Sequence, residues 1–264
     1  MAELSPMMKQ YLEIKSQNED SILFFRVGDF YEMFFDDAKK ASEELDLVLT
    51  GKDCGQEERA PMCGVPYHSC EAYIARLVEK GYKVAICEQT ENPATAKGLV
   101  KREIIRVVTP GTVIEDAMLE EGKNNFLASV SVTEDGMGLC FTDASTGECH
   151  ATVLGGDTSE NDVGDELARF SPRELLISED LEKAAAELWN YIFEKFTQTV
   201  TVRPKESFNT KKTEPLVAKH FGESRLKELG IDAKSPIMSA VGAVIDYLYD
   251  TGKNGKISVN KLDV

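Results

Sequence analysis

The sequence lacks the features that mark membrane and secreted proteins. No apolar run approaches the roughly 20 residues of a membrane span, and Met1–Pro6 has neither the basic nor the apolar region of a signal peptide. The six cysteines include no Cys-x-x-Cys pair, which argues against a disulfide framework and favours a reducing cytosol. We therefore expect a cytoplasmic protein that makes no membrane contact.

Sequence motifs for metals and nucleotides are missing as well. One cluster that could be imagined as zinc ligands has spacings that do not match the common zinc fingers, and it contains Cys54, Cys63, His68 and Cys70. The segment Gly252–Ile257 lacks both the spacing of a P-loop and its Ser or Thr after the lysine. We therefore expect no metal and no cofactor in this chain.

Basic residues are in the minority, since 30 Lys and Arg stand against 46 Asp and Glu for a net charge of -16. Residues 1–114 carry -5 of this charge and residues 115–264 carry -11. Such acidity opposes non-specific DNA affinity, which depends on neutralised phosphates, but it permits a local basic strip. One strip contains Lys97, Lys101, Arg102 and Arg106.

The first part of the chain alternates strand and helix patterns, which predicts a small α/β domain with a mixed sheet over residues 1–114. Ser5 and Pro6 are typical of a helix start, and Gly81 is placed to end a later helix. The expected helices are that beginning at Pro6, one from about Tyr31 to Leu45 and one near Ser69–Lys80; the expected strands are Ile22–Val27, Leu47–Thr50, Tyr82–Glu88 and Glu103–Val108.

A polar, acidic stretch at residues 115–124 predicts a linker to a second domain over residues 125–250. The elements expected there are strands at Phe126–Val132, Met137–Asp143, Glu148–Leu154, Glu174–Ile177 and Thr199–Arg203, and helices at Ser159–Phe170, Asp180–Tyr191 and Ser235–Thr251. Up to the last strand this is the β-β-β-α-β-α-β order of the ribonuclease H fold. Residues 251–264 are expected to begin a linker to domains beyond the chain.

Gly28–Glu32 follows the first strand and is expected where that strand turns into a helix. Phe30 and Glu32 place an aromatic ring two residues from a carboxylate, a pair that suits stacking on a base and hydrogen bonding to its edge. The alternative is that Phe30 belongs to the core and that Glu32 is an acid favoured by the dipole of a helix N-terminus.

Several segments resemble the MutS family of DNA mismatch-repair proteins. Arg26–Phe34 is similar to the family's mismatch-recognition motif, and Asp143–Glu148 is the best match in the second domain. Further segments that resemble family signatures are Pro61–His68, Val84–Gln89, Pro93–Gly98 and Arg106–Thr112. The one departure that we find in these motifs is Cys63, where the family usually has alanine.

The resemblance implies that Phe30 enters the minor groove of mismatched double-stranded DNA and stacks on the mispaired base, while Glu32 hydrogen-bonds that base. Unstacking costs a few kcal/mol per step and stacking on a ring returns about 1–3 kcal/mol, so binding is favoured where pairing is already weak. By the same resemblance, Lys52 and Arg102 contact the DNA backbone. Weaker candidates for the backbone or groove are Met62, Arg76 and Lys97.

The resemblance also implies that the second domain is a connector, which relays signals to an ATPase and offers a surface to MutL. The full-length parent, a protein of the bacterial cytosol or nucleoid, would then be a homodimer that binds ATP and Mg²⁺. This chain would be a non-enzymatic N-terminal fragment. Two other classes stay open: a protein-interaction module with Phe30 in its core, and a metal-dependent nuclease. The acids considered for the nuclease are Asp143, Glu148, Asp180 and Asp246.

Overall fold

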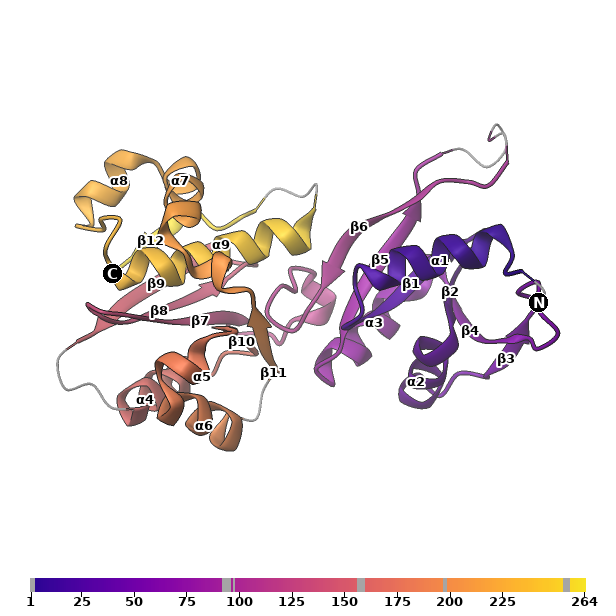
Figure 1. Ribbon diagram of the computed structural model, residues 1–264, viewed down its shortest axis with the longest axis horizontal. Helices are drawn as coiled ribbons and strands as arrows, with labels where there is room; N and C mark the ends of the chain where they lie inside the picture. The colour runs from indigo at the N-terminus through magenta and orange to yellow at the C-terminus, as the bar shows by residue number, and fades with distance from the viewer. Residues whose placement is uncertain (1–2, 92–95, 97, 156–159, 197–198, 254–256) are drawn as a thin grey trace. The chain divides into compact units, whose positions relative to one another are not determined.

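The computed structural model describes residues 3–91, 96, 98–155, 160–196, 199–253 and 257–264. The chain forms two compact units (Figure 1), the first running to Thr109 and the second beginning at Pro110. Gly111 donates its backbone N–H to Glu174 Oε2 at 3.0 Å, so residues just before the predicted linker already pack in the second unit. Within the described ranges, no helix is both long and apolar enough to cross a membrane.

The first unit is a six-stranded mixed sheet in the order β3-β4-β2-β1-β5-β6, in which β1 and β5 are parallel. Its elements are α1 (Pro6–Ser16), β1 (Ser21–Val27), β2 (Phe30–Phe34), α2 (Phe35–Leu45), β3 (Thr50–Lys52), β4 (Ala60–Pro66), η1 (Tyr67–Ser69), α3 (Cys70–Glu79), β5 (Lys83–Gln89) and β6 (Arg102–Val108).

Two helix boundaries predicted from the sequence are confirmed. Ser5 caps α1 by accepting the backbone N–H of Met8, and Pro6 is the first helical residue. Gly81 ends α3 in the left-handed region, at a φ of 87°, and its N–H donates to the carbonyl of Val78 at 2.9 Å.

The helix predicted from about Tyr31 is wrong over its first residues. Residues 30–34 form β2, which pairs with β1 and β4, and the helix begins only at Phe35. Apart from Glu32 the segment is apolar, so spacing alone fits a helical stripe as well as a strand. The alternating exposure of Phe30, Tyr31 and Glu32 identifies the strand.

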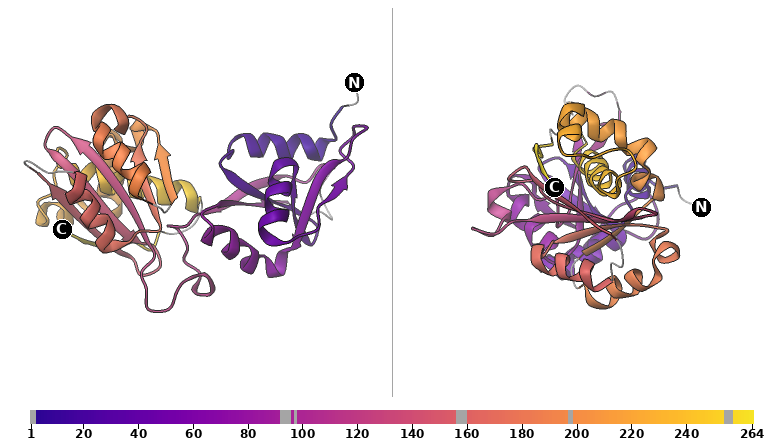
Figure 2. Two further views of the ribbon diagram at one scale, coloured as in Figure 1. Left: turned by 90° about the horizontal axis from the view of Figure 1, so that it is seen from below. Right: turned by 90° about the vertical axis from the view of Figure 1, so that its left-hand side faces the viewer.

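Helices cover both faces of this sheet. On one face Tyr11 of α1 packs edge-on against Phe25 and Phe34, with ring centres 5.4 and 5.0 Å apart. On the other face lies α2, where Cys63 Sγ of β4 donates to the carbonyl of Ala38 at 3.4 Å. Figure 2 shows α1 above the sheet in its left-hand view.

The second unit is a mixed sheet in the order β11-β10-β7-β8-β9-β12, with helices on both faces (Figures 1 and 2). Its elements are η2 (Asp116–Met118), β7 (Phe126–Thr133), β8 (Gly136–Asp143), β9 (Glu148–Leu154), α4 (Glu160–Phe170), β10 (Glu174–Ser178), α5 (Leu181–Ala184), α6 (Ala186–Lys195), β11 (Thr199–Arg203), η3 (Lys205–Phe208), α7 (Thr210–Phe221), α8 (Glu223–Glu228), α9 (Pro236–Gly252) and β12 (Lys261–Asp263). Its strands and helices, with the first unit, confirm the predicted α/β class.

Three features of the second unit differ from the expectation. The helix expected at 180–191 is divided into α5 and α6 at Ala185, and α7 and α8 have no counterpart in the prediction. Within residues 251–264, expected as a linker, β12 pairs in parallel with β9. That three-residue strand therefore belongs to the sheet, and its pairing with a strand about 110 residues earlier gives no local sequence signal.

Candidate nucleic-acid interface

The most exposed aromatic side chain of the first unit's sheet stands at the tip of the β1–β2 hairpin. Val27 pairs with Phe30, so Gly28 and Asp29 alone form the loop. Gly28 has a φ of +58°, in the left-handed region that glycine adopts at the first position of tight hairpin loops. Phe30 is 47% exposed, so a large apolar ring projects from a short, well-defined turn.

Successive residues of β2 point to opposite faces, which places Phe30, Glu32 and Phe34 on the face that α1 covers. Phe34 is fully buried and Phe30 is not, so exposure grows along the strand toward the hairpin tip. The core alternative for Phe30 therefore does not fit this structure. Since Glu32 lies in a strand, the helix-dipole role considered for it is also wrong.

Glu32 forms an ion pair with Lys52 through its Oε2 and the lysine Nζ. The carboxylate side chain is 14% exposed and the lysine side chain 28%. Lys52 lies on β3, while Glu32 lies on β2 opposite Gly64 of the intervening β4. A Cβ at position 64 would lie 3.6 Å from Glu32 Cγ, at van der Waals contact, so the glutamate side chain passes beside this glycine.

Arg26 supports the hairpin from the opposite face of the sheet. Its Nε donates to the carbonyl of Gly28 at 2.5 Å, and its Nη1 lies 3.1 Å from Glu88 Oε1. The guanidinium also stacks on Tyr67, 3.6 Å from the ring centre, and Tyr67 N–H donates to the carbonyl of Asp29 at 3.0 Å. Four contacts thus fix the loop that carries Phe30.

Tyr31 completes this support, because its hydroxyl donates to the same carboxylate oxygen of Glu88. Burial, together with the hydrogen bond to Glu88 and its negative charge, raises the pKa of Tyr31 above its ordinary value. The phenol therefore stays protonated at neutral pH and remains a donor. The sequence alone indicates no role for Arg26, Tyr67 or Gly64, although all three lie in the segments that carry the family resemblance.

The other predicted DNA-contacting residues are dispersed. Met62 lies on β4 opposite Phe34 of β2, on the same face of the sheet as Phe30. Arg76 lies on α3 and holds the end of α2, with its Nη2 3.0 Å from Asp46 Oδ2. Lys97 lies outside the described residues. Of Met62 and Arg76, the structure therefore brings only Met62 to the face of Phe30, Glu32 and Lys52.

Arg102 is 8% exposed, and its guanidinium bonds inside the unit. Nε donates to the carbonyl of Arg26 at 2.7 Å, while Nη1 donates to Gln10 Oε1 at 2.9 Å and to the carbonyl of Val100 at 3.0 Å. Burial lowers the pKa of Arg102. These contacts give Arg102 a structural role and weigh against the predicted phosphate contact.

The carboxylates considered for a nuclease form hydrogen bonds and ion pairs with other groups of the second unit. Asp143 is fully buried; its Oδ2 accepts the N–H of Asn125 at 2.9 Å, and its Oδ1 accepts the N–H and hydroxyl of Ser145 at 2.9 and 2.6 Å. Asp246 Oδ1 lies 3.0 Å from Lys212 Nζ. Among the residues that the structure describes, no three His, Cys, Asp or Glu converge as a metal site.

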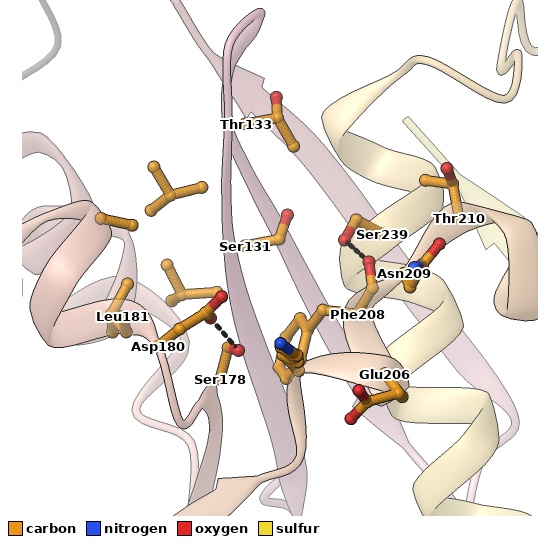
Figure 3. Close-up of a pocket in the computed structure, with 14 residues that line it drawn as sticks. Ser131, Thr133, Ser178, Asp180, Leu181, Glu206, Phe208, Asn209, Thr210 and Ser239 are labelled. Carbon is orange, nitrogen blue, oxygen red and sulfur yellow. Dashed lines mark hydrogen bonds between the residues drawn. The ribbon is translucent and has the colours of Figure 1, made fainter.

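A pocket of about 380 Å³ lies where β7 and β10 end, beside η3 and α7 (Figure 3). The carboxyl ends of parallel strands are a common ligand site in α/β sheets. Here, however, hydroxyl groups line it: Ser131 Oγ donates to the carbonyl of Pro236 at 2.9 Å, and Ser178 Oγ donates to Asp180. The acidic residues among those that line the pocket are Asp180 and Glu206, and no third His, Cys, Asp or Glu of the described residues joins them to form the metal site that a metal-dependent nuclease needs.

Comparison with known proteins matches both units to one family. The family model described as MutS domain I matches residues 5–117, and that described as MutS domain II matches residues 125–263. DNA mismatch repair protein MutS of Ruminiclostridium cellulolyticum is 46% identical over 263 residues, which cover 100% of this chain and 30% of that protein.

Two further proteins with the same name give similar values. The protein of Acetivibrio thermocellus is 47% identical, and the match covers 96% of this chain and 29% of that protein. The protein of Clostridioides difficile is 46% identical, and the match covers 100% of this chain and 27% of that protein. The chain thus spans less than a third of these relatives. Domain I, the mismatch-binding domain of the family, corresponds to the unit that carries Phe30. This chain belongs to the MutS family of DNA mismatch-repair proteins, and its two units are MutS domains I and II.

Proposed function

We propose that this chain recognises mispaired or unpaired bases in duplex DNA by inserting Phe30 from the minor groove and stacking it on the faulty base. The observation that carries the proposal is the 47% exposure of this ring at the tip of a braced two-residue hairpin. An exposed phenylalanine loses apolar contact with water when it enters a base stack, so its position favours insertion over a role in the core.

The selectivity follows from the cost of opening the duplex. Separating a stacked step costs a few kcal/mol, whereas one ring stacked on a base returns about 1–3 kcal/mol. In a matched duplex the free energy gained by stacking the ring does not exceed the cost of unstacking the bases. A mismatch has already lost part of its pairing and stacking, so this cost is lower there. Stacking accepts any base, and Glu32 adds a hydrogen bond to the base edge, which extends recognition to many mispairs.

A direct test compares binding to two fluorescent duplexes that differ by a single G·T mispair. We expect the chain to prefer the mismatched duplex and the Phe30→Ala variant to lose that preference. Phe193 is the matched control, since it is 50% exposed and lies on α6 of the second unit. Phe193→Ala should behave like the unchanged chain. A Phe30→Ala variant that still discriminates the two duplexes would falsify the proposal.

Other properties proposed for this chain follow from its family and concern the full-length protein. Domain II would relay the state of the DNA-bound domain to an ATPase that binds ATP and Mg²⁺ outside these two domains, and would offer a surface to MutL. The protein would act as a homodimer in the bacterial cytosol. The two domains alone would have no catalytic activity, and their net charge of -16 predicts weak DNA binding.

A further inference from the structure

The ion pair between Glu32 and Lys52 bears directly on how a carboxylate can approach DNA. Duplex DNA carries one negative charge per about 1.7 Å of its axis, so a lone carboxylate beside the groove is repelled. In this chain the carboxylate that would meet the base is already bonded to an ammonium group. The two side chains together bring no net charge to the groove.

We propose that Lys52 is the counter-ion of Glu32 during base recognition, and thereby determines specificity, instead of binding a DNA phosphate. This inference rests on the proposed function, because it explains how Glu32 performs the role given to it there. A carboxylate has enough lone pairs to accept from the lysine and from a base at once. The pair can therefore persist while Glu32 bonds the base.

The position of the ammonium group supports this assignment. Lys52 Nζ lies 5.7 Å from the ring centre of Phe34, a fully buried residue, so the side chain lies along the sheet. Its exposed fraction is 28%, compared with 60% for Lys39, which pairs with Asp36 on the surface of α2. Reaching for a phosphate would strip the counter-ion from a carboxylate that is only 14% exposed, which is costly.

The packing around the pair also favours a fixed arrangement. Glu32 reaches toward β3 over Gly64, where a Cβ would lie 3.2 Å from the carbonyl oxygen of Tyr31. A side chain at position 64 would also touch the pair, since its Cβ would lie 3.6 Å from Glu32 Cγ. In matched DNA the bases stay paired and stacked, so Glu32 finds no unpaired base to bond and the neutral pair adds little attraction; at a mispair, the carboxylate gains such a partner. The pair therefore contributes to discrimination and not to general affinity.

A double-mutant cycle tests this inference with the 264-residue chain and the G·T duplex. We expect Lys52→Met to weaken mismatch binding about tenfold or more, because it leaves a carboxylate unpaired. Glu32→Gln should weaken binding in the unchanged chain but restore it in the Lys52→Met variant. This reversal of sign is expected only if the lysine acts through the glutamate.

Controls separate the counter-ion role from folding and from phosphate contact. Lys52→Arg keeps the charge and should keep the mismatch preference, and thermal unfolding of each variant reports its folded state. Lys39→Met removes a similar surface charge and should leave the preference unchanged. A phosphate contact instead predicts that the Lys52 and Glu32 effects add, and that losing the lysine reduces the salt slope of binding by about one.

The outcomes also distinguish this inference from the proposed function. If Phe30→Ala abolishes the mismatch preference while the Lys52 and Glu32 effects are additive, the counter-ion role is wrong and the stacking role stands. If the unchanged chain does not distinguish the two duplexes, both proposals fail. If Lys52→Arg behaves like Lys52→Met although both are folded, positive charge at this position is insufficient and the counter-ion role is overturned.

Discussion

The guanidinium carbon of Arg26 lies 3.6 Å from the ring centre of Tyr67, on the sheet face opposite Phe30. The same guanidinium donates to the carbonyl of Gly28 and pairs with Glu88. Arg26 therefore joins the hairpin loop to β5 and to the residue that follows β4. These contacts support the hairpin tip that carries Phe30 from the face of the sheet opposite its ring.

We predict that Arg26→Gln loosens this loop and lowers mismatch preference although the residue faces away from Phe30. The variant loses a charged hydrogen bond, worth about 1.5–3 kcal/mol, and a stacked cation. Hydrogen exchange at the amides of Asp29 and Phe30 should accelerate. Tyr67→Phe retains the stacked ring and is the control expected to exchange at the original rate. Unchanged exchange in Arg26→Gln would show that the brace is not needed.

Phe30 and Phe34 provide a second prediction, because they are the same residue type on the same face of one strand with 47% and 0% exposure. Phe34 packs edge-on against Tyr11 at 5.0 Å, so Phe34→Ala should lower the free energy of unfolding by about 3–5 kcal/mol. Phe30→Ala should leave it nearly unchanged. Calorimetry of both variants measures the difference, and similar losses in the two would place Phe30 in the core.

The strand β2 shows what the sequence could and could not reveal about the candidate site. Phe34, Ala38, Ala41 and Leu45 do follow helical spacing, and α2 does bury the last three. The same spacing extended back to Phe30 was misleading, because a run of apolar residues satisfies both periodicities. Pairing with β1 and β4 decides the matter, and such pairing depends on residues far away in the sequence.

The sequence also does not reveal which partners the charged residues of the site take. The family resemblance implies a phosphate contact for Arg102 and Lys52 alike, yet Arg102 is buried with internal hydrogen bonds and Lys52 pairs with Glu32. Which partner a basic side chain takes depends on the strand register that brings groups together. The register also explains why Gly64 matters, since the sequence gives no sign that it lies opposite Glu32.

We predict that Gly64→Ala impairs mismatch recognition through Glu32. Gly64 does not have a positive φ, so the backbone admits alanine, but the added Cβ would lie 3.2 Å from the carbonyl oxygen of Tyr31 and 3.6 Å from Glu32 Cγ. The tight contact is the one with the backbone of β2, so we expect β2 and β4 to shift locally and to move Glu32 relative to Lys52. Mismatch preference should fall with only a small change in melting temperature.

The background of Glu32→Ala isolates the cause of this effect. If Gly64→Ala acts by displacing the carboxylate, it should change DNA binding little once that carboxylate has been removed. Equal losses from Gly64→Ala in the presence and absence of Glu32 would instead indicate a direct clash between position 64 and DNA, or a distortion of β4.

Asp246 supplies a prediction about pH in the second unit. Burial raises the pKa of Asp246, but hydrogen bonds from Lys212 and Ser207, with the charges of Lys212 and Arg203, outweigh burial and hold it below the ordinary value of 3.8. A lowered pKa in the folded state means that the ionised group stabilises the fold above its unfolded pKa. That stabilisation is lost as the pH falls through the folded value.

We therefore expect Asp246→Asn to lower the free energy of unfolding by about 1.5–3 kcal/mol at pH 7, and the difference from the unchanged chain to shrink as the pH falls below 3.8. Urea unfolding followed by Trp189, the single tryptophan, measures this in the second unit. Asp250→Asn is the control, since Asp250 also pairs with Arg203 but is 51% exposed and should contribute less. A difference that stays constant from pH 7 to pH 3 would mean that the charge of Asp246 is not what stabilises this unit.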